Sequence, residues 1–146
     1  MSSHIFNMPK PMIASILYRE IICYNVGDWI FDGTGDTSRG LGQIKPSTAQ
    51  AAEQYYSNEN PNTITVHTLD ELNSSLESNN FNIYSVALVL WHCAKQVGVW
   101  IDLDYDYSNS ARVLARYNGT GDNATKYGNE VHEYLDPFVK YYWEVY

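Results

Sequence analysis

The sequence predicts a single, mainly helical domain over residues 1–146. The chain is 45% hydrophobic and 18% charged, which suits one globular core rather than a disordered segment. Apolar residues recur at helical spacing in several segments, and helix-start residues precede most of them. No internal repeat, low-complexity tract or linker divides the chain. We therefore expect a helical bundle around one hydrophobic central helix, interrupted by a small glycine-rich hairpin or loop.

The first predicted helix begins at Pro9 and Pro11, ends near Asn25, and contains one acid, Glu20. At helical spacing, Glu20 shares a face with apolar residues, and burial on such a face raises the pKa of a carboxyl group. A protonated acid in a dry cleft is what general-acid cleavage of a glycosidic bond requires. The alternative is an ordinary glutamate that pairs with Arg19 or lies at a helix edge. The apolar face comprises Ile13, Ile16, Leu17, Cys23 and Tyr24.

A glycine-rich segment follows over residues 27–44, where five glycines and three aspartates predict a turn-rich loop or a small hairpin. In residues 40–44, Gly-Leu-Gly-Gln-Ile, alternate glycines allow the backbone to approach a ligand, and Gln43 offers a donor and an acceptor. These features favour one wall of a polar groove; the alternative is a tight turn in which the glycines serve geometry alone. One of Asp28, Asp32 and Asp36 is a candidate second carboxylate opposite Glu20; the alternative is that all three are solvated turn residues.

Start signals predict the later helices in order. Ser47 caps a helix after Pro46, Thr68 caps the next with Glu71 placed for a capping box, and Asn82 caps the most hydrophobic one. That apolar segment has hardly any polar face, so we place it at the centre of the core, with His92 as a hydrogen-bonded core histidine. The predicted ranges are 48–56, 69–77, 83–97, 110–117 and 129–142, with an acidic loop at 102–109.

Tyr117 and Asn118 close the helix predicted at 110–117. A tyrosine offers a flat apolar face with a hydroxyl tip that suits stacking on a sugar, and Asn118 offers an amide. The alternative is a helix C-terminus that ends at Asn-Gly in the left-handed conformation.

Composition excludes several classes of function. The net charge of −8 argues against nucleic-acid binding, because phosphates demand a basic patch. The apolar runs are too short and too often broken by charges to span a membrane, and the first residues do not form an export signal. No metal-ligand spacing is present, and residues 102–113 lack the glycine and glutamate of a calcium loop, so we expect no cofactor. Cys23 and Cys93 are expected to be buried free thiols, with a disulfide as the alternative.

The motifs taken together resemble the lysozyme-like superfamily, above all the soluble lytic transglycosylase domain and the goose-type lysozymes. That family has a catalytic Glu on a helix, then Gly-Leu-Met-Gln, Pro-x-Thr-Ala, Asn-Ile and Ala-Tyr-Asn, with a tyrosine over the cleft. The chain differs at Ile21, Gly42 and Arg116, where the family has Ser, Met and an uninterrupted Ala-Tyr-Asn. The matching positions are Glu20, 40–44, Pro46–Ala49, Asn82–Ile83, Ala115–Gly119 and Tyr127.

This resemblance implies cleavage of the β-1,4 bond between N-acetylmuramic acid and N-acetylglucosamine in peptidoglycan, with Glu20 as the acid. It implies that Gln43, Tyr117, Asn118 and Tyr127 line the cleft and that the backbone around Ile44 binds acetamido groups. By analogy with goose-type lysozymes, Asp36 orients water. We expect a monomer that meets a glycan strand at a cell wall, whether secreted, envelope-bound or phage-delivered. The alternatives are cleavage of another amino-sugar polymer such as chitin and a catalytically silent glycan-binding domain.

Overall fold

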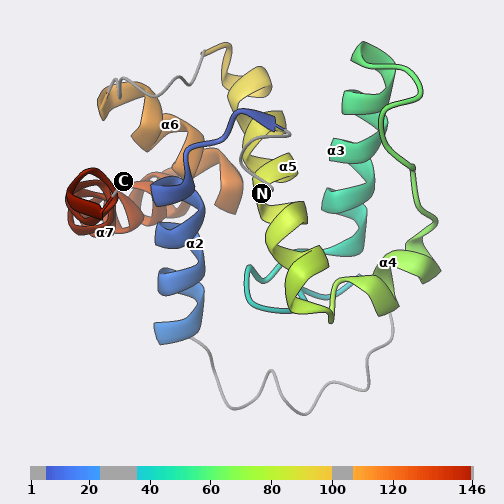
Figure 1. Cartoon of the computed structure of the whole chain (residues 1–146), viewed down its shortest axis with the longest axis horizontal. Coiled ribbons are helices and arrows are strands. Elements are labelled where there is room, and N and C mark those ends of the chain that lie inside the picture. Colours follow the sequence, from blue (N-terminus) through green and yellow to red (C-terminus); the bar gives the residue numbers. More distant parts are fainter. Residues whose placement is uncertain (1–5, 24–35, 100–106, 146) are drawn as a thin grey trace.

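The computed structural model describes residues 6–23, 36–99 and 107–145, and most of these residues are helical (Figure 1). This confirms the mainly helical class. Within the described residues the predicted hairpin is reduced to one antiparallel bridge between Arg39 and Ile44. The helices are α2 (Lys10–Ile22), α3 (Pro46–Glu59), α4 (Leu69–Ser75), α5 (Asn79–Val97), α6 (Tyr107–Asn118) and α7 (Asp122–Val145).

Helix α5 lies in the middle of the molecule, with α3 and α4 on one side and α2, α6 and α7 on the other (Figure 1). Its apolar segment is buried almost all round, and Val86, Leu88 and Leu90 are each at most 1% exposed. A helix without a polar face has to be covered on several sides, so neighbouring helices surround it. The predicted central helix is confirmed. Helix α7 packs against α6 and α2, which brings residues from both ends of the chain together.

The predicted caps hold for α4 and differ for α3. The Thr68 side chain accepts from the Glu71 N–H, and the Glu71 carboxylate accepts from the Thr68 N–H, so the predicted capping box is present. Helix α3 begins at Pro46, with Lys45 at the N-cap position. Both lie two residues earlier than predicted. Ser47 lies inside this helix, and its backbone N–H donates to Asp36.

Asn82 is a buried hydrogen-bonding residue inside α5 and not a helix cap, because α5 begins four residues earlier than predicted, at Asn79. The Asn82 amide oxygen accepts from the Gly42 N–H at 2.7 Å, and its amide nitrogen donates at 2.9 Å to the carbonyls of Arg39 and Leu76. Because buried polar groups are costly unless they are paired, two of these bonds fix the turn at residues 39–44 against α5, and the third fixes the end of α4.

Both cysteines are free, so the disulfide alternative is wrong. Cys93 is buried in α5 as predicted, and burial raises the pKa of its thiol to about 12. The prediction of burial is wrong for Cys23, which is exposed just after the end of α2.

Two predictions lie wholly or partly outside the described residues: the first half of the glycine-rich segment and most of the acidic loop at 102–109. The last helix is longer than predicted, since it begins at Asp122 and continues through Pro137. None of the described helices combines the length and the apolar character needed to cross a membrane.

We predict that Asn82→Ala lowers the free energy of unfolding by about 3 kcal/mol, because the buried Gly42 N–H loses its partner and the Arg39 and Leu76 carbonyls each lose a hydrogen bond. Urea denaturation followed by circular dichroism measures this change. Asn80→Ala is the matched control, since Asn80 is exposed on the same helix. Equal stability of the two variants would contradict the role given to Asn82.

Candidate active site

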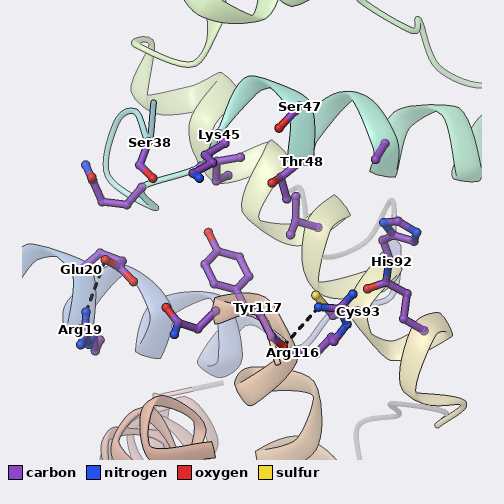
Figure 2. A pocket seen from close by; sticks show the side chains of 17 residues that line it. Arg19, Glu20, Ser38, Lys45, Ser47, Thr48, His92, Cys93, Arg116 and Tyr117 are labelled. Carbon is purple, nitrogen blue, oxygen red and sulfur yellow. Dashed lines mark hydrogen bonds and ion pairs between the residues drawn. The ribbon is translucent and has the colours of Figure 1, made fainter. Parts of the chain in front are cut away.

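A cavity of ≈ 600 Å³ opens between α2, the turn at residues 39–44, α3, α5 and the end of α6 (Figure 2). Tyr117 stands in the middle of the view, with Glu20 at one end and His92 at the other. The cavity brings together residues that lie far apart in the sequence, including five that were predicted as site residues. These five are Glu20, Gln43, Ile44, Tyr117 and Asn118.

Glu20 reaches the cavity because α2 packs its apolar face inward up to this position. Ile16 and Ile13 are buried one and two turns earlier, whereas Ile21 and Ile22 beyond Glu20 are about half exposed. The predicted apolar face therefore holds as far as Glu20, while Cys23 lies outside it. The Glu20 side chain is 13% exposed, so its carboxyl group faces the cavity rather than bulk solvent.

Two neighbours contact the Glu20 carboxyl group directly. The Tyr127 hydroxyl donates a hydrogen bond to Oε1 at 2.6 Å. The Arg19 guanidinium lies 3.7 Å from Oε2, and it also stacks 4.7 Å above the centre of the Tyr127 ring. Arg19 is shared with a second acid, because its Nε lies 3.7 Å from Glu130 Oε1. The ion pair between Glu20 and Arg19, which was the alternative interpretation of this glutamate, is thus present, and Glu20 also lines the cavity.

Burial raises the pKa of Glu20 above its ordinary value of 4.5. The Tyr127 hydrogen bond and the Arg19 charge favour the carboxylate and lower the pKa, while the Glu130 charge raises it; burial outweighs the lowering effects. The arrangement favours the protonated acid while keeping a stabiliser for the carboxylate within 2.6 Å. A group that must give up a proton and take one back benefits from both conditions.

The turn that carries Gln43 needs its glycines. Gly40 has φ +68°, and a Cβ there would overlap the Asn82 amide. Gly42 has no room for a side chain, because a Cβ would overlap Val86 of the central helix. The turn as it is built therefore excludes a larger side chain at position 42. Both predicted interpretations of the turn therefore hold: the glycines serve geometry, and Gln43 lines the cavity.

Tyr117 and Tyr127 connect the turn to Glu20. The Tyr117 hydroxyl donates to the Gly42 carbonyl at 2.7 Å, and its ring stacks on Tyr127 with a 13° interplanar angle and 6.5 Å between ring centres. Tyr127, predicted to lie over the cleft, is 3% exposed and is not among the described lining residues. Its contact with the cavity runs through Glu20, so it acts on the carboxyl group and not on a ligand.

Two predicted residues have other partners. Asp36 is exposed and accepts from the Ser47 N–H at 2.8 Å and the Ser47 hydroxyl at 2.6 Å, which caps α3. Slight burial raises its pKa, but the Ser47 bonds and Lys45 outweigh that effect and lower it, so Asp36 is ionised. It is not among the described residues that line the cavity. Ile44 lines the cavity, yet its N–H and C=O are paired with Arg39.

Three basic residues that line the cavity, Arg19, Lys45 and Arg116, were not predicted as site residues, and His92 was wrongly placed in the core. Arg19 and Arg116 both line the cavity, and the only signals for them were the positions next to Glu20 and inside the Ala-Tyr-Asn motif. His92 is half-buried at the cavity wall, and burial, reinforced by the nearby Arg116 charge, lowers its pKa. The Asn-Gly ending is as predicted, since α6 ends at Asn118 and Gly119 has φ +128°.

No group of three potential metal ligands occurs among the described residues. The described lining offers one carboxyl group, hydroxyl and amide groups, and guanidinium groups. Such a set can donate a proton and hold polar or anionic groups. No protein-family model, curated protein or solved structure matches this chain.

We predict that Glu20→Gln stabilises the fold at pH 7. The folded pKa of Glu20 is raised, so between 4.5 and that higher value the folded state binds more protons than the unfolded state. The free energy of unfolding of the parent therefore falls as pH rises through this window, and a neutral glutamine escapes the fall. Urea denaturation at pH 4 and pH 7 measures it. Two results would contradict the raised pKa. One is a variant that is less stable than the parent at pH 7; the other is a difference in the free energy of unfolding between variant and parent that is the same at both pH values.

Proposed function

We propose that the protein is a lysozyme-like glycosidase that cleaves the β-1,4 bond between N-acetylmuramic acid and N-acetylglucosamine in peptidoglycan. The observation that carries the proposal is the Glu20 carboxyl group. It is buried, has a raised pKa, is held at one end of the cavity by Tyr127, and shares that cavity with Gln43, Tyr117 and Asn118. The order of the sequence motifs supports the same family.

Burial alone does not single out Glu20, because Glu53 is also buried, at 1% exposure. Glu53 differs in that both of its carboxylate oxygens are bonded to His67, one to the backbone N–H at 2.7 Å and one to Nδ1 at 2.8 Å. It is also not among the described lining residues. Glu53 fastens the chain before α4 to α3, whereas Glu20 faces open space that a substrate can fill.

In the proposed reaction, the protonated Glu20 gives its proton to the bridging oxygen as the bond from that oxygen to the muramyl C1 breaks. The Tyr127 hydroxyl and Arg19 then stabilise the carboxylate that is left behind. The carboxylate next takes a proton from the nucleophile that attacks C1. Gln43 and Asn118 offer amide groups to the sugar, and the Tyr117 ring offers a stacking face, since its hydroxyl is committed to Gly42.

The nucleophile is proposed to be the muramyl C6 hydroxyl, which makes the protein a lytic transglycosylase. Hydrolysis by two carboxylates needs a second acid at the site. Glu20 is the one carboxyl group among the described lining residues, and Asp36 is occupied by Ser47. Attack by the C6 hydroxyl transfers its proton to Glu20, closes a 1,6-anhydro ring and consumes no water.

We predict that Glu20→Gln lowers the rate of release of muropeptides from purified peptidoglycan at least about a hundredfold, which is the usual loss of a general acid. Glu133→Gln is the matched control, because Glu133 is exposed on α7 and away from the cavity. Clearing by Glu20→Gln at the parental rate would end the catalytic assignment. A parent that binds the polymer and releases nothing would instead favour a glycan-binding domain.

We predict that the released muropeptides carry 1,6-anhydro ends and are lighter than hydrolysis products by one water. Mass spectrometry of a limit digest distinguishes the two products, with a hydrolytic muramidase digest of the same wall as the reference. Reducing ends would contradict the transglycosylase mechanism and would return a water-orienting role to a carboxylate such as Asp36.

A further inference from the structure

The cavity is basic, although the chain is acidic. Three of the nine lysine and arginine residues of the chain line it, against a single acidic residue, Glu20, among the described lining residues. Even with Glu20 ionised, three cationic side chains stand against one carboxylate, so the described lining is positively charged within a chain whose net charge is −8. A cavity of this kind attracts anionic groups that the rest of the surface repels. The three basic residues are Arg19, Lys45 and Arg116.

Two of these charges already have acidic neighbours. Arg19 lies 3.7 Å from Glu20 and 3.7 Å from Glu130. Lys45 is close enough to Asp36 to lower the pKa of that carboxyl group. Both residues therefore already have an acidic partner for their charge, although the buried Nε of Arg19 makes no hydrogen bond.

Arg116 differs from both. It is partly buried at the end of α6, and within the described residues its hydrogen bond is from Nη1 to the Gly119 carbonyl at 3.2 Å, with no carboxylate in ion-pair range. A guanidinium group has five N–H donors in a planar fork that suits a carboxylate. A partly desolvated charge is costly unless it is paired. Among the described residues, Arg116 is therefore a cation without an acidic partner at the cavity wall, at the position that interrupts the family motif.

The place of Arg116 in the cavity is separate from that of the acid. Figure 2 shows Arg116 beside Cys93 on α5, with the Tyr117 ring between this group and Glu20. A ligand whose bridging oxygen lies at Glu20 therefore has to extend past Tyr117 to reach the guanidinium. The neighbour His92 has a lowered pKa and is neutral at pH 7, so it does not share the charge.

We propose that Arg116 is an anchor for a carboxylate of the substrate, so that the cavity selects a glycan with charged peptide stems over a neutral one. This inference rests on the proposed function and names the feature of the polymer that the site requires. Lys45 adds long-range attraction, and Arg116 supplies the directed contact.

The test compares binding to two forms of one purified peptidoglycan. In one form the carboxylates are intact; in the other they are coupled with methylamine by a carbodiimide, which turns them into neutral amides. Binding is measured by co-sedimentation with the Glu20→Gln protein, so that cleavage does not consume the polymer. Arg116→Gln and Arg116→Lys are added to this background, and Lys126→Gln is the charge-matched control from the exposed face of α7.

We expect neutralisation of the wall and Arg116→Gln each to weaken binding roughly tenfold, the usual effect of losing one charge-assisted hydrogen bond. Together they should weaken it no further, because both remove the same contact. Arg116→Lys should restore part of the preference for the charged wall, and Lys126→Gln should bind like its parent. Added salt should weaken binding to the intact wall and leave binding to the neutral wall nearly unchanged.

Equal binding of the two walls, or an Arg116→Gln loss that persists in full on the neutral wall, overturns the proposal. A preference for the charged wall that is undiminished in Arg116→Gln also overturns it. Circular dichroism of each variant checks that the variant is folded. Release of muropeptides by the protein with Glu20 intact is measured in parallel. Failure to cleave either wall, with charge-dependent binding retained, would remove the proposed function and leave the anionic site standing.

Discussion

The site depends on the hydrogen bonds of the Asn82 amide to Gly42 and Arg39, which hold the turn at residues 39–44 on the central helix. From that turn a continuous path leads to Glu20: the Gly42 carbonyl binds the Tyr117 hydroxyl, the Tyr117 ring stacks on Tyr127, and the Tyr127 hydroxyl binds the carboxyl group. The path joins four helices and one turn. A displacement of the turn therefore shifts both the wall of the cavity and the support of its acid.

Glu20 is held between opposing influences, which suits a group that has to change its protonation state. Burial favours the neutral acid, while Tyr127 and Arg19 favour the carboxylate. The Glu130 carboxylate lies 3.7 Å from Arg19 Nε and offsets part of the positive charge of Arg19. Arg19 therefore stabilises the Glu20 carboxylate less. Under the proposed function, the basic lining would attract an anionic polymer even though the protein as a whole is acidic.

The helices, the central helix and the residues that share the cavity were predictable, because they follow from local periodicity and from motifs in a known order. Asn82 was mistaken for a helix cap because an asparagine side chain can either cap a helix or hydrogen-bond a neighbouring turn. Only the start of α5 at Asn79 distinguishes the two roles. Arg116 gave no signal beyond an interrupted motif, since its importance depends on which groups face it in space. Tyr127 was found, but its partner was not, because a contact over 107 positions leaves no trace in one sequence.

The central claim is that the fold keeps a proton on Glu20. A ¹³C NMR titration of the glutamate carboxyl carbons tests it directly, with the Glu20 resonance assigned by its absence from the Glu20→Gln spectrum. The account predicts a titration midpoint above 4.5 for this residue. A midpoint at or below 4.5 would mean that Tyr127 and Arg19 outweigh burial, and the acid would be ionised when the substrate arrives.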